Sequence, residues 1–459
     1  MTAPPNIVVV LSDEHTPAAT GCYGHPTVRT PNIDRLAAVG TLYESAYCAS
    51  PMCVPSRLSL LSGRYVHDIG AWDNGVLPDP SVRSWGDHLR AAGYESVLAG
   101  RTHFNGADRL WGFDRRLSDD LEHWVDHSGR PPRRVPEWQR RTNSHVAETG
   151  VGEHPNTRHD ETVTDLVVDY LTSRAQDGGE RPFLLYVGYM QPHFPLVAAP
   201  EFAAWYDPST VVLPPTRGAA PEDQHPVIAQ LRRSFRNDEP LTDEQQRVAT
   251  ARYWALVSQL DHHVGRILDV IDESPLRDNT VIVYTSDHGE MLGHHGVWQK
   301  QCFYEPAVTV PLLVRTPAQA RGAAAPARVA GDVSQVDLLP TLRGLAGLPA
   351  DASLPGRDLL GATVEPRPVI SEYHAQGMLD AGFMLKRGRY KYCAYVGHPP
   401  QLFDVVADPE ERQDLAGDAA HAQVLAELDA QLRWHLDPDA VDHRAKADQR
   451  ARAAAVGAQ

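Results

Sequence analysis

The sequence predicts an α/β fold with a large mixed, mostly parallel sheet flanked by helices, followed by a small C-terminal α+β subdomain. Short β-branched runs alternate with helical patterns through most of the chain, and two strand patterns and a helix follow near its end. A length of 459 residues suits one large catalytic domain and a smaller unit. We expect the catalytic domain at 1–365, the subdomain at 366–442 and a frayed tail at 443–459.

The elements of the main domain are predicted in chain order. Residues 7–11 form a short apolar run typical of a buried strand, and residues 32–39 have a helical pattern. Residues 111–240 have a poorer pattern with proline-rich pieces such as 130–136 and 212–215, and we expect these pieces to be surface insertions that could wall a substrate pocket. Residues 242–272 carry apolar side chains at spacings of three and four, which predicts a long amphipathic helix. This helix leads into a β-branched strand at 280–285.

The C-terminal part changes in pattern. A helix is predicted at 336–346, strands at 369–373 and 390–395, and a further helix at 422–436. The tail from His443 is rich in Ala, Arg and Gln, so we expect it to fray.

Composition excludes several classes of protein. Hydrophobic residues make up 42% and charged residues 22%, which excludes wholesale disorder. The formal charge of −16 would repel a phosphate backbone, so we expect no nucleic-acid partner. No apolar run approaches the roughly 20 residues that span a bilayer, and no basic residue precedes the first apolar run, so we expect neither a membrane partner nor a secretory signal. Five scattered cysteines argue against a disulfide framework and favour the cytoplasm.

Acidic residues follow two of the predicted strands. Asp13 and Glu14 come after the first strand, and Asp287 and His288 follow the strand at 280–285. Ligands of open α/β sheets bind at the carboxyl ends of strands, so the two pairs could converge on one site. Three carboxylates and one imidazole suit a divalent cation such as Ca²⁺, Mg²⁺ or Mn²⁺. Alternatively, these acids simply cap the helices that follow.

A more specific motif lies at residues 53–57, Cys-Val-Pro-Ser-Arg, with Ser-Gly-Arg at 62–64. It resembles the Cys-x-Pro-Ser-Arg motif of the type I, formylglycine-dependent sulfatases of the alkaline phosphatase superfamily. In that family the motif directs oxidation of its cysteine to formylglycine. Further segments at 31–37, 257–266, 286–300 and 402–412 resemble the family in the same order. The resemblance implies an alkaline-phosphatase-like core and hydrolysis of sulfate monoesters.

The resemblance also implies a set of site residues. The expected metal ligands are Asp13, Glu14, Asp287, His288 and the modified Cys53. The other expected catalytic residues are Arg57, which would hold the hydrated aldehyde, His103 as the base that collapses the intermediate, and His193 and Lys300, which would contact sulfate and protonate the leaving oxygen. The expected sulfate contacts are Arg101 and Asn74.

Formylglycine suits this chemistry because its hydrate carries two hydroxyls on one carbon. One hydroxyl can attack sulfur and release the alcohol, and deprotonation of the other then expels sulfate and restores the aldehyde. Pro55 and Ser56 suit the first turn of a helix, which would place residue 53 at a positive helix end that favours a sulfate. A formylglycine-generating enzyme is therefore an expected partner during maturation.

Three positions depart from the family pattern. Arg101 replaces a usual lysine, which keeps the charge but cannot give up a proton. Glu14 stands where many members have Asp or Gln, and His288 where many have Asn. We expect Ca²⁺, while the longer carboxylate and the imidazole leave Mn²⁺ and Mg²⁺ open.

Two other functions stay open on sequence alone. Phosphonate monoester and phosphodiester hydrolases share the formylglycine site, although they resemble a Tyr-x-Thr arrangement where this chain has His103. A non-catalytic metal-binding protein that keeps Cys53 as a thiol is the other alternative. Residues 102–113 are similar to choline sulfatases, and Trp72, Trp111 or Trp124 could form an aromatic cage for a quaternary ammonium. Aryl and sugar sulfates, and the formation of a homo-oligomer, also stay open.

Overall fold

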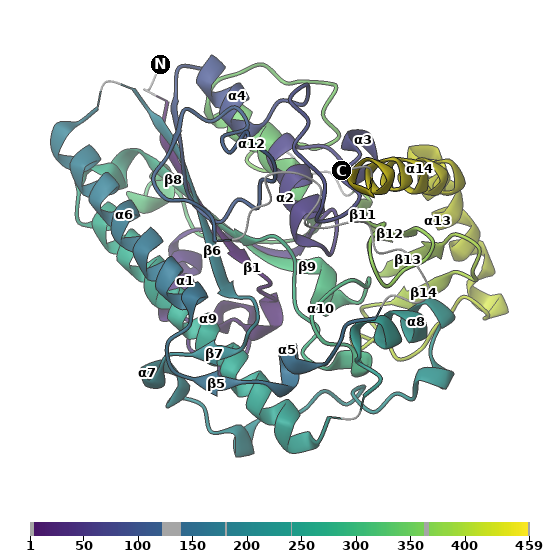
Figure 1. Ribbon diagram of the computed structural model, residues 1–459. Helices are drawn as coiled ribbons and strands as arrows, with labels where there is room; N and C mark the ends of the chain where they lie inside the picture. Colours follow the sequence, from purple (N-terminus) through teal and green to yellow (C-terminus); the bar gives the residue numbers. More distant parts are fainter. Residues whose placement is uncertain (1–3, 122–138, 180, 240, 362–366, 458–459) are drawn as a thin grey trace.

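A large sheet with helices on both faces forms the main body of the computed structural model, which describes residues 4–121, 139–179, 181–239, 241–361 and 367–457 (Figure 1). The sheet has the order β10-β2-β9-β8-β1-β6-β3-β4. Its strands are β1 Asn6–Asp13, β2 Thr41–Tyr47, β3 Glu95–Gly100, β4 Arg115–Arg116, β6 Phe183–Pro192, β8 Thr280–Ser286, β9 Thr309–Arg315 and β10 Ala327–Ser334. Only β9 runs antiparallel to its neighbours in the described part of this sheet, which confirms the predicted fold class.

Two helical layers cover the sheet. One face carries α1 Pro31–Val39, α6 Pro155–Asp177 and α9 Asp243–Asp272, and the other carries α2 Cys53–Ser62, α4 Trp85–Ala91 and α12 Leu338–Leu345 (Figure 1). Alternate residues of β1 pack into the two layers, Ile7 and Val9 on one side and Val8 and Val10 on the other. Because both faces are covered, the strand reads as a continuous apolar run.

The stretch at 111–240, whose sequence pattern is poor, also contains elements of the main sheet and its helical layer. It contains α6 and the central strand β6, although residues 122–138, with Trp124, lie outside the described residues. The signal of α6 is weak because its buried apolar side chains are few among many polar ones. Its shorter elements are α5 Ser144–Ala147, β5 Gly150–Val151, β7 Val197–Ala198, α7 Pro200–Ala203 and α8 Pro226–Phe235.

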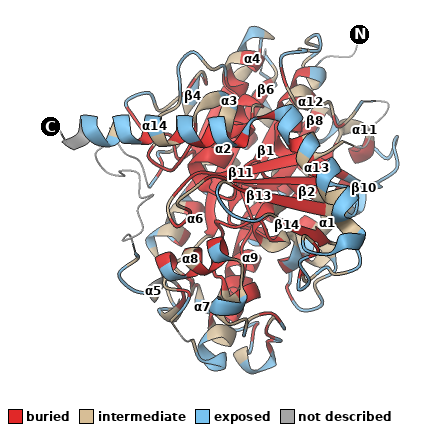
Figure 2. Cartoon of the chain, turned by 90° about the vertical axis from the view of Figure 1, so that its right-hand side faces the viewer, coloured by how far each residue is buried: buried red, intermediate tan, exposed pale blue. Residues whose placement is uncertain are grey.

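The C-terminal region forms a second, antiparallel sheet of the order β11-β12-β13-β14. Its elements are β11 Val369–Tyr373, β12 Gly382–Arg387, β13 Tyr390–Tyr395, β14 Gln401–Asp404, α13 Ala422–His435 and α14 Pro438–Gly457. Short helices elsewhere are α3 Val66–Ile69, α10 Glu305–Val308 and α11 Pro317–Ala320. Figure 2 shows the strands buried and much of the surface of α14 exposed.

The tail expected to fray from His443 is instead the greater part of α14. Trp72 donates its indole N–H to Asp448, Gln449 donates to Asp73, and Arg452 pairs with Asp73. These polar contacts and the burial of Val441 and Ala445 hold the helix in place, and neither is evident from composition, which predicted fraying.

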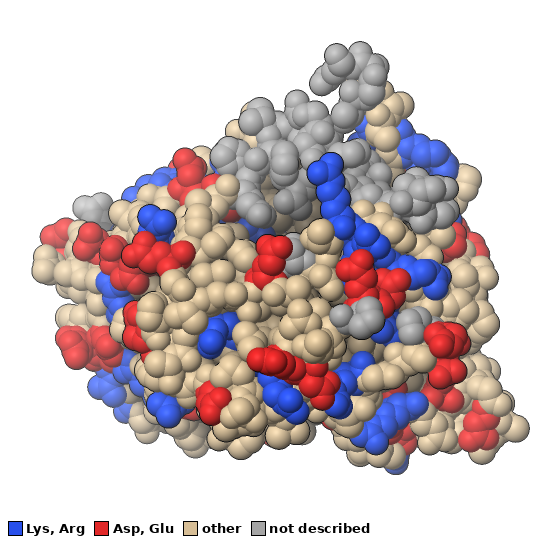
Figure 3. All heavy atoms as spheres, turned by 60° about the horizontal axis from the view of Figure 1, so that its bottom comes forward, with Lys and Arg blue, Asp and Glu red and all other residues tan. Residues whose placement is uncertain are grey.

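Figure 3 shows how the charged side chains are distributed over one face of the molecule. Acidic and basic side chains are interspersed over most of the described part of this face. Among the described residues, no helix combines the length and the apolar character needed to cross a bilayer.

Candidate active site

The two acidic pairs meet at the carboxyl edge of the large sheet. Strands β1 and β8 are parallel neighbours in the register Ser12 to Ser286, so the residues that follow lie side by side. Asp13, which ends β1, and Asp287, which follows β8, are fully buried. The backbone N–H of Glu14 donates to Asp287 Oδ1 at 3.1 Å, which ties one strand end to the other.

Cys53 is the first residue of α2 and is directed at this edge. Its Sγ lies 3.3 Å from His288 Nε2 and 4.0 Å from Asp13 Oδ1. The side chain of Asn74 accepts a hydrogen bond from the N–H of Val54 at 3.0 Å, which satisfies a donor that the helix start leaves unpaired. Asn74 thus supports the helix end that carries Cys53.

Gly63 ends α2 and explains the glycine of the extended motif. Its φ is 62°, a left-handed conformation that glycine adopts without strain. A Cβ at this position would also lie 2.7 Å from Cβ of Leu339 in α12. Two independent constraints therefore require glycine here, and they fix how α2 packs.

Arg57, one turn after Cys53, orients both carboxylates. Its Nε donates to Asp287 Oδ2 at 2.9 Å and its Nη2 to Asp13 Oδ2 at 3.0 Å. Its Nη1 donates to the Arg101 carbonyl and the Tyr186 hydroxyl, each at 2.9 Å. These partners are carboxylates and backbone rather than residue 53, so the expected contact with a hydrated aldehyde stays a prediction.

Arg101 and His103 follow β3 and reach the site from the other side of Asp13. Arg101 Nε lies 2.5 Å from Asp13 Oδ2, and its Nη2 lies 3.3 Å from His103 Nδ1. His103 has a φ of 58°, and its N–H donates to Asp120 Oδ2 at 2.6 Å. The Asp120 carboxylate therefore fixes an unusual backbone conformation at this histidine.

Lys300 and His193 converge on Glu14. Lys300 Nζ lies 2.9 Å from Glu14 Oε2, and His193 Nε2 lies 3.4 Å from the same oxygen. His193 Nδ1 lies 2.6 Å from the Phe194 carbonyl, which can only accept, so Nδ1 carries the proton of the neutral ring. Lys300 Nζ has no hydrogen-bond partner among the described residues apart from this ion pair.

Burial and the positive charges of Arg57, Arg101 and Lys300 set the ionisation of the site. Burial by itself would raise the pKa of Asp13, but the Arg101 guanidinium and its neighbours hold it well below its usual range. Burial raises the pKa of Glu14 well above its usual range, and the charge of Lys300 does not cancel this. Burial, assisted by the Asp13 charge, raises the pKa of the Cys53 thiol to about 12. The unmodified residue is therefore a protonated thiol and a weak nucleophile.

Four donor atoms are arranged as a divalent cation would require. One ligand atom each from Asp13, Cys53, Asp287 and His288 lies within 4.8 Å of the others. His288 Nδ1 lies 3.1 Å from the Gly289 carbonyl, which leaves the lone pair on Nε2, the nitrogen that faces Cys53. The donors thus fit one metal ion.

Glu14 lies outside this set of four donors. It forms a neighbouring group with Asp13 and His193. Its role as a further metal ligand therefore stays a prediction.

The sequence reasoning missed two residues that shape the site. Tyr186 of β6 accepts from Arg57 and donates to the Arg101 carbonyl at 2.9 Å. Glu290, buried three residues after Asp287, accepts from the N–H of Gln299 at 2.7 Å and thereby anchors the segment that carries Lys300. Its place next to the Asp287 and His288 pair was the available signal.

Two of the three tryptophans proposed as an aromatic cage, Trp72 and Trp111, have other partners, and Trp124 lies outside the described residues. Trp72 is buried, has the Arg444 guanidinium 5.0 Å above its ring, and donates to Asp448. Trp111 packs against Phe104 and donates to backbone carbonyls. Neither presents an open ring to a ligand.

Comparisons with known proteins agree with this geometry. The sulfatase family model matches residues 5–348, and a model described as N-sulphoglucosamine sulphohydrolase, C-terminal, matches residues 293–436. A choline-sulfatase of Rhizobium meliloti is 31% identical over 96% of this chain and 88% of its own. An arylsulfatase K of Danio rerio is 28% identical over 94% of this chain and 84% of its own. A solved phosphonate monoester hydrolase of Agrobacterium radiobacter shares the fold, with a TM-score of 0.76 at 22% identity over 97% of this chain and 96% of its own.

Proposed function

This chain belongs to the sulfatase family and is a sulfuric ester hydrolase, and we propose that it acts through a formylglycine made from Cys53 together with one divalent cation. The observation that carries the proposal is the position of Cys53, buried at the start of α2 and in contact with His288 and Asp13. A residue at a helix start meets the positive end of the helix dipole, which favours an anionic ester.

Conversion of Cys53 to formylglycine would supply the nucleophile that the thiol does not provide. Burial keeps Cys53 protonated, so the unmodified side chain is not an attacking group at neutral pH. A formylglycine would supply a hydrate hydroxyl that can form a covalent intermediate, and we propose that a formylglycine-generating enzyme makes it.

The metal proposal rests on the way that Arg57 and Arg101 hold Asp13. Both guanidiniums bond to Oδ2, and Oδ1 is the oxygen that faces Cys53 and His288. A bound divalent cation would supply Lewis-acid stabilisation of the sulfuryl oxygens. Hard oxygen donors favour Ca²⁺, and the imidazole of His288 keeps Mn²⁺ and Mg²⁺ as alternatives.

The remaining side chains would bind and protonate the ester. Lys300 and Gln191 are buried, and apart from the ion pair of Lys300 with Glu14 their polar side-chain atoms have no hydrogen-bond partners among the described residues, so ester oxygens could satisfy them. Lys300 would place its protonated amine at the leaving oxygen, with His193 beside it. His103, beside Arg101, would take the proton that releases sulfate.

We infer that the substrate is a small sulfate monoester, and choline sulfate is the first candidate because of the choline-sulfatase relative. The phosphonate monoester hydrolase that shares the fold keeps phosphonate monoesters and phosphodiesters as the competing class of substrates. We further propose a cytoplasmic location, where the five unpaired cysteines would stay reduced.

Mass spectrometry of the protein made in its own host tests the nucleophile. The tryptic peptide of residues 36–57 should be lighter by about 18 Da than the peptide with intact cysteine. A panel of choline sulfate, an aryl sulfate and a phosphonate monoester should then show the highest kcat/KM for a sulfate. Intact Cys53 in active protein, or a preference for the phosphonate, would overturn the proposal.

A further inference from the structure

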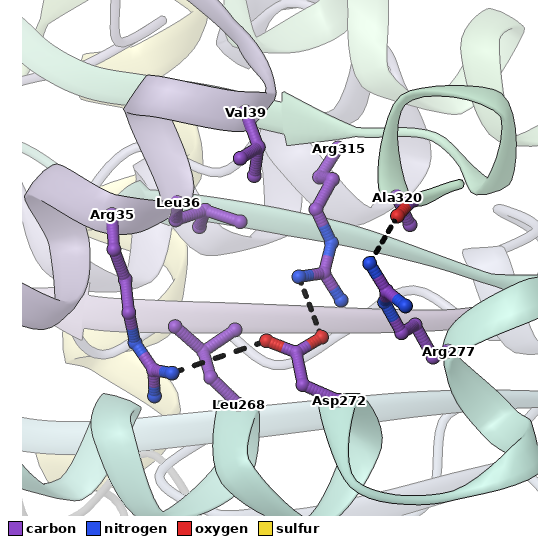
Figure 4. Close-up of a pocket in the computed structure, with 8 residues that line it drawn as sticks. All are labelled: Arg35, Leu36, Val39, Leu268, Asp272, Arg277, Arg315 and Ala320. Carbon is purple, nitrogen blue, oxygen red and sulfur yellow. Dashed lines mark hydrogen bonds and ion pairs between the residues drawn. The ribbon is translucent and has the colours of Figure 1, made fainter. Parts of the chain in front are cut away.

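A polar cavity lies at the edge of the large sheet opposite to the candidate active site. Because β9 runs antiparallel, its last residue, Arg315, lies beside the start of β8, whereas Asp287 follows the end of β8. The cavity has a volume of about 260 Å³ and lies between α1, the end of α9 and α11 (Figure 4). Its polar lining consists of Arg35, Asp272, Arg277 and Arg315, with Leu36 and Leu268 among the apolar residues.

Cations outnumber carboxylates around this arginine pocket. Arg315 Nη1 lies 2.7 Å from Asp272 Oδ1, and Arg35 pairs with Asp269 at 2.5 Å. Arg277 donates to the Ala320 carbonyl at 2.7 Å and has no carboxylate partner among the described residues. Three guanidinium groups are therefore accompanied by two carboxylates. The cluster has a net positive charge, which one bound anion would balance.

One edge of the Arg315 guanidinium has nothing to bind. The side chain is only 4% exposed, yet Nε and Nη2 have no hydrogen-bond partner among the described residues. These two N–H groups lie on the same edge of the planar group and point in parallel, as bidentate binding of an oxyanion requires. In Figure 4 the nitrogens not bonded to Asp272 face the side of the pocket on which Arg277 lies. Buried donors without partners are costly and are usually satisfied.

We propose that the arginine pocket binds a small oxyanion, two of whose oxygens accept from Arg315 Nε and Nη2 while Arg277 supplies a further charge. Carboxylate, sulfate and phosphate groups share this chemistry, since each presents two oxygens on one central atom. The pocket shares no residue with the candidate active site, so this binding is separate from the hydrolysis proposed above.

Crystals soaked in selenate test the proposal directly, because anomalous scattering locates the anion. We expect a peak within hydrogen-bonding distance of Arg315 Nε and Nη2 in the wild-type protein. Acetate as a competitor separates the sources: loss of the peak shows that the pocket also takes carboxylates, and a persistent peak shows a preference for tetrahedral anions.

Two variants should weaken selenate binding at the pocket in different ways. Arg315→Lys keeps the positive charge beside Asp272 but removes the parallel N–H groups of Nε and Nη2. Arg277→Gln removes an exposed charge with little risk to folding. By calorimetric titration with selenate, each should weaken binding at this pocket at least tenfold and leave turnover unchanged. Arg90→Gln, an exposed arginine of α4, is the matched control.

The proposal is overturned if selenate is absent from the pocket of the wild-type protein while it occupies other sites. It is also overturned if both pocket variants bind as the Arg90→Gln control does.

Discussion

The contact between α14 and Asp73 yields a prediction about both stability and activity. Arg452 approaches Asp73 with two nitrogens, one of them 3.0 Å from Oδ1, and the Asp73 side chain is 5% exposed. Arg452→Met removes this bidentate pair at nearly constant length. Asp73 keeps hydrogen bonds from Gln449 at 2.8 Å and from the N–H of Gly75 at 2.9 Å.

The size of the effect follows from the loss of charge-assisted bonds at a nearly buried carboxylate. Such bonds contribute about 1.5–3 kcal/mol, and breaking a fully buried pair costs about 3–5 kcal/mol. Because two hydrogen bonds to Asp73 remain, we expect the free energy of unfolding to fall by about 2–3 kcal/mol. A coupling energy of about 1–3 kcal/mol with Asp73→Asn in a double-mutant cycle would assign the loss to this pair.

Arg452→Met should also affect the active site, through Asn74. Asn74 follows Asp73, accepts from the Val54 N–H, and its carbonyl accepts from Asn105 at 2.9 Å. A loosened segment should therefore disturb the start of α2 and lower kcat several-fold while the fold is retained.

Urea unfolding and steady-state kinetics on a sulfate ester measure the two effects. Arg450→Met, an exposed arginine of the same helix, is the control and should change stability by less than about 0.5 kcal/mol. The reasoning is refuted if Arg452→Met unfolds as the control does and keeps kcat within about twofold.

Three further predictions concern the nucleophile, the metal and acid stability. Cys53→Ala should lower kcat by at least about 10³-fold in an assay with a sulfate ester. Cys22→Ala should retain activity because Cys22 packs in the helical layer on the other face of the sheet from α2. An active Cys53→Ala enzyme would contradict the proposed nucleophile. Asp287→Asn should reduce bound divalent metal, measured by mass spectrometry of the dialysed protein, while Asp278→Asn, an exposed acid, should bind as the unmodified protein does; equal metal content in both would contradict the ligand set. Although burial of Glu372 opposes its ionisation, His67 and His374 lower its pKa from 4.5 to about 2, so its contribution to stability is complete above about pH 4.5 and is lost as the pH falls toward 2. Urea unfolding between pH 3 and pH 7 should therefore show a smaller acid loss in Glu372→Gln than in the unmodified protein, and identical slopes would contradict the assignment.

Much of the fold could be predicted because its signals are local. The β-branched runs became β1 and β8, and the apolar spacing at 242–272 became α9 at Asp243–Asp272. The strands predicted at 369–373 and 390–395 match β11 and β13. Helix α6 was not predicted because most of its residues are polar. Its burial depends on β3, β6 and α9, which pack against it.

The sequence by itself determined the fold class, the family and the types of residue at the site, because strand and helix periodicity and the Cys-Val-Pro-Ser-Arg motif are properties of adjacent residues. Only the tertiary structure decided which donors meet: Asp13, Cys53 and Asp287 are brought together by the pairing of β1 with β8 and by the packing of α2. It also decided that Arg57 holds both carboxylates, that α14 is bonded to Asp73, and that Arg315 keeps an open edge. Each of these depends on hydrogen bonds or burial between residues far apart in the chain, and spacing along a sequence does not encode such distances.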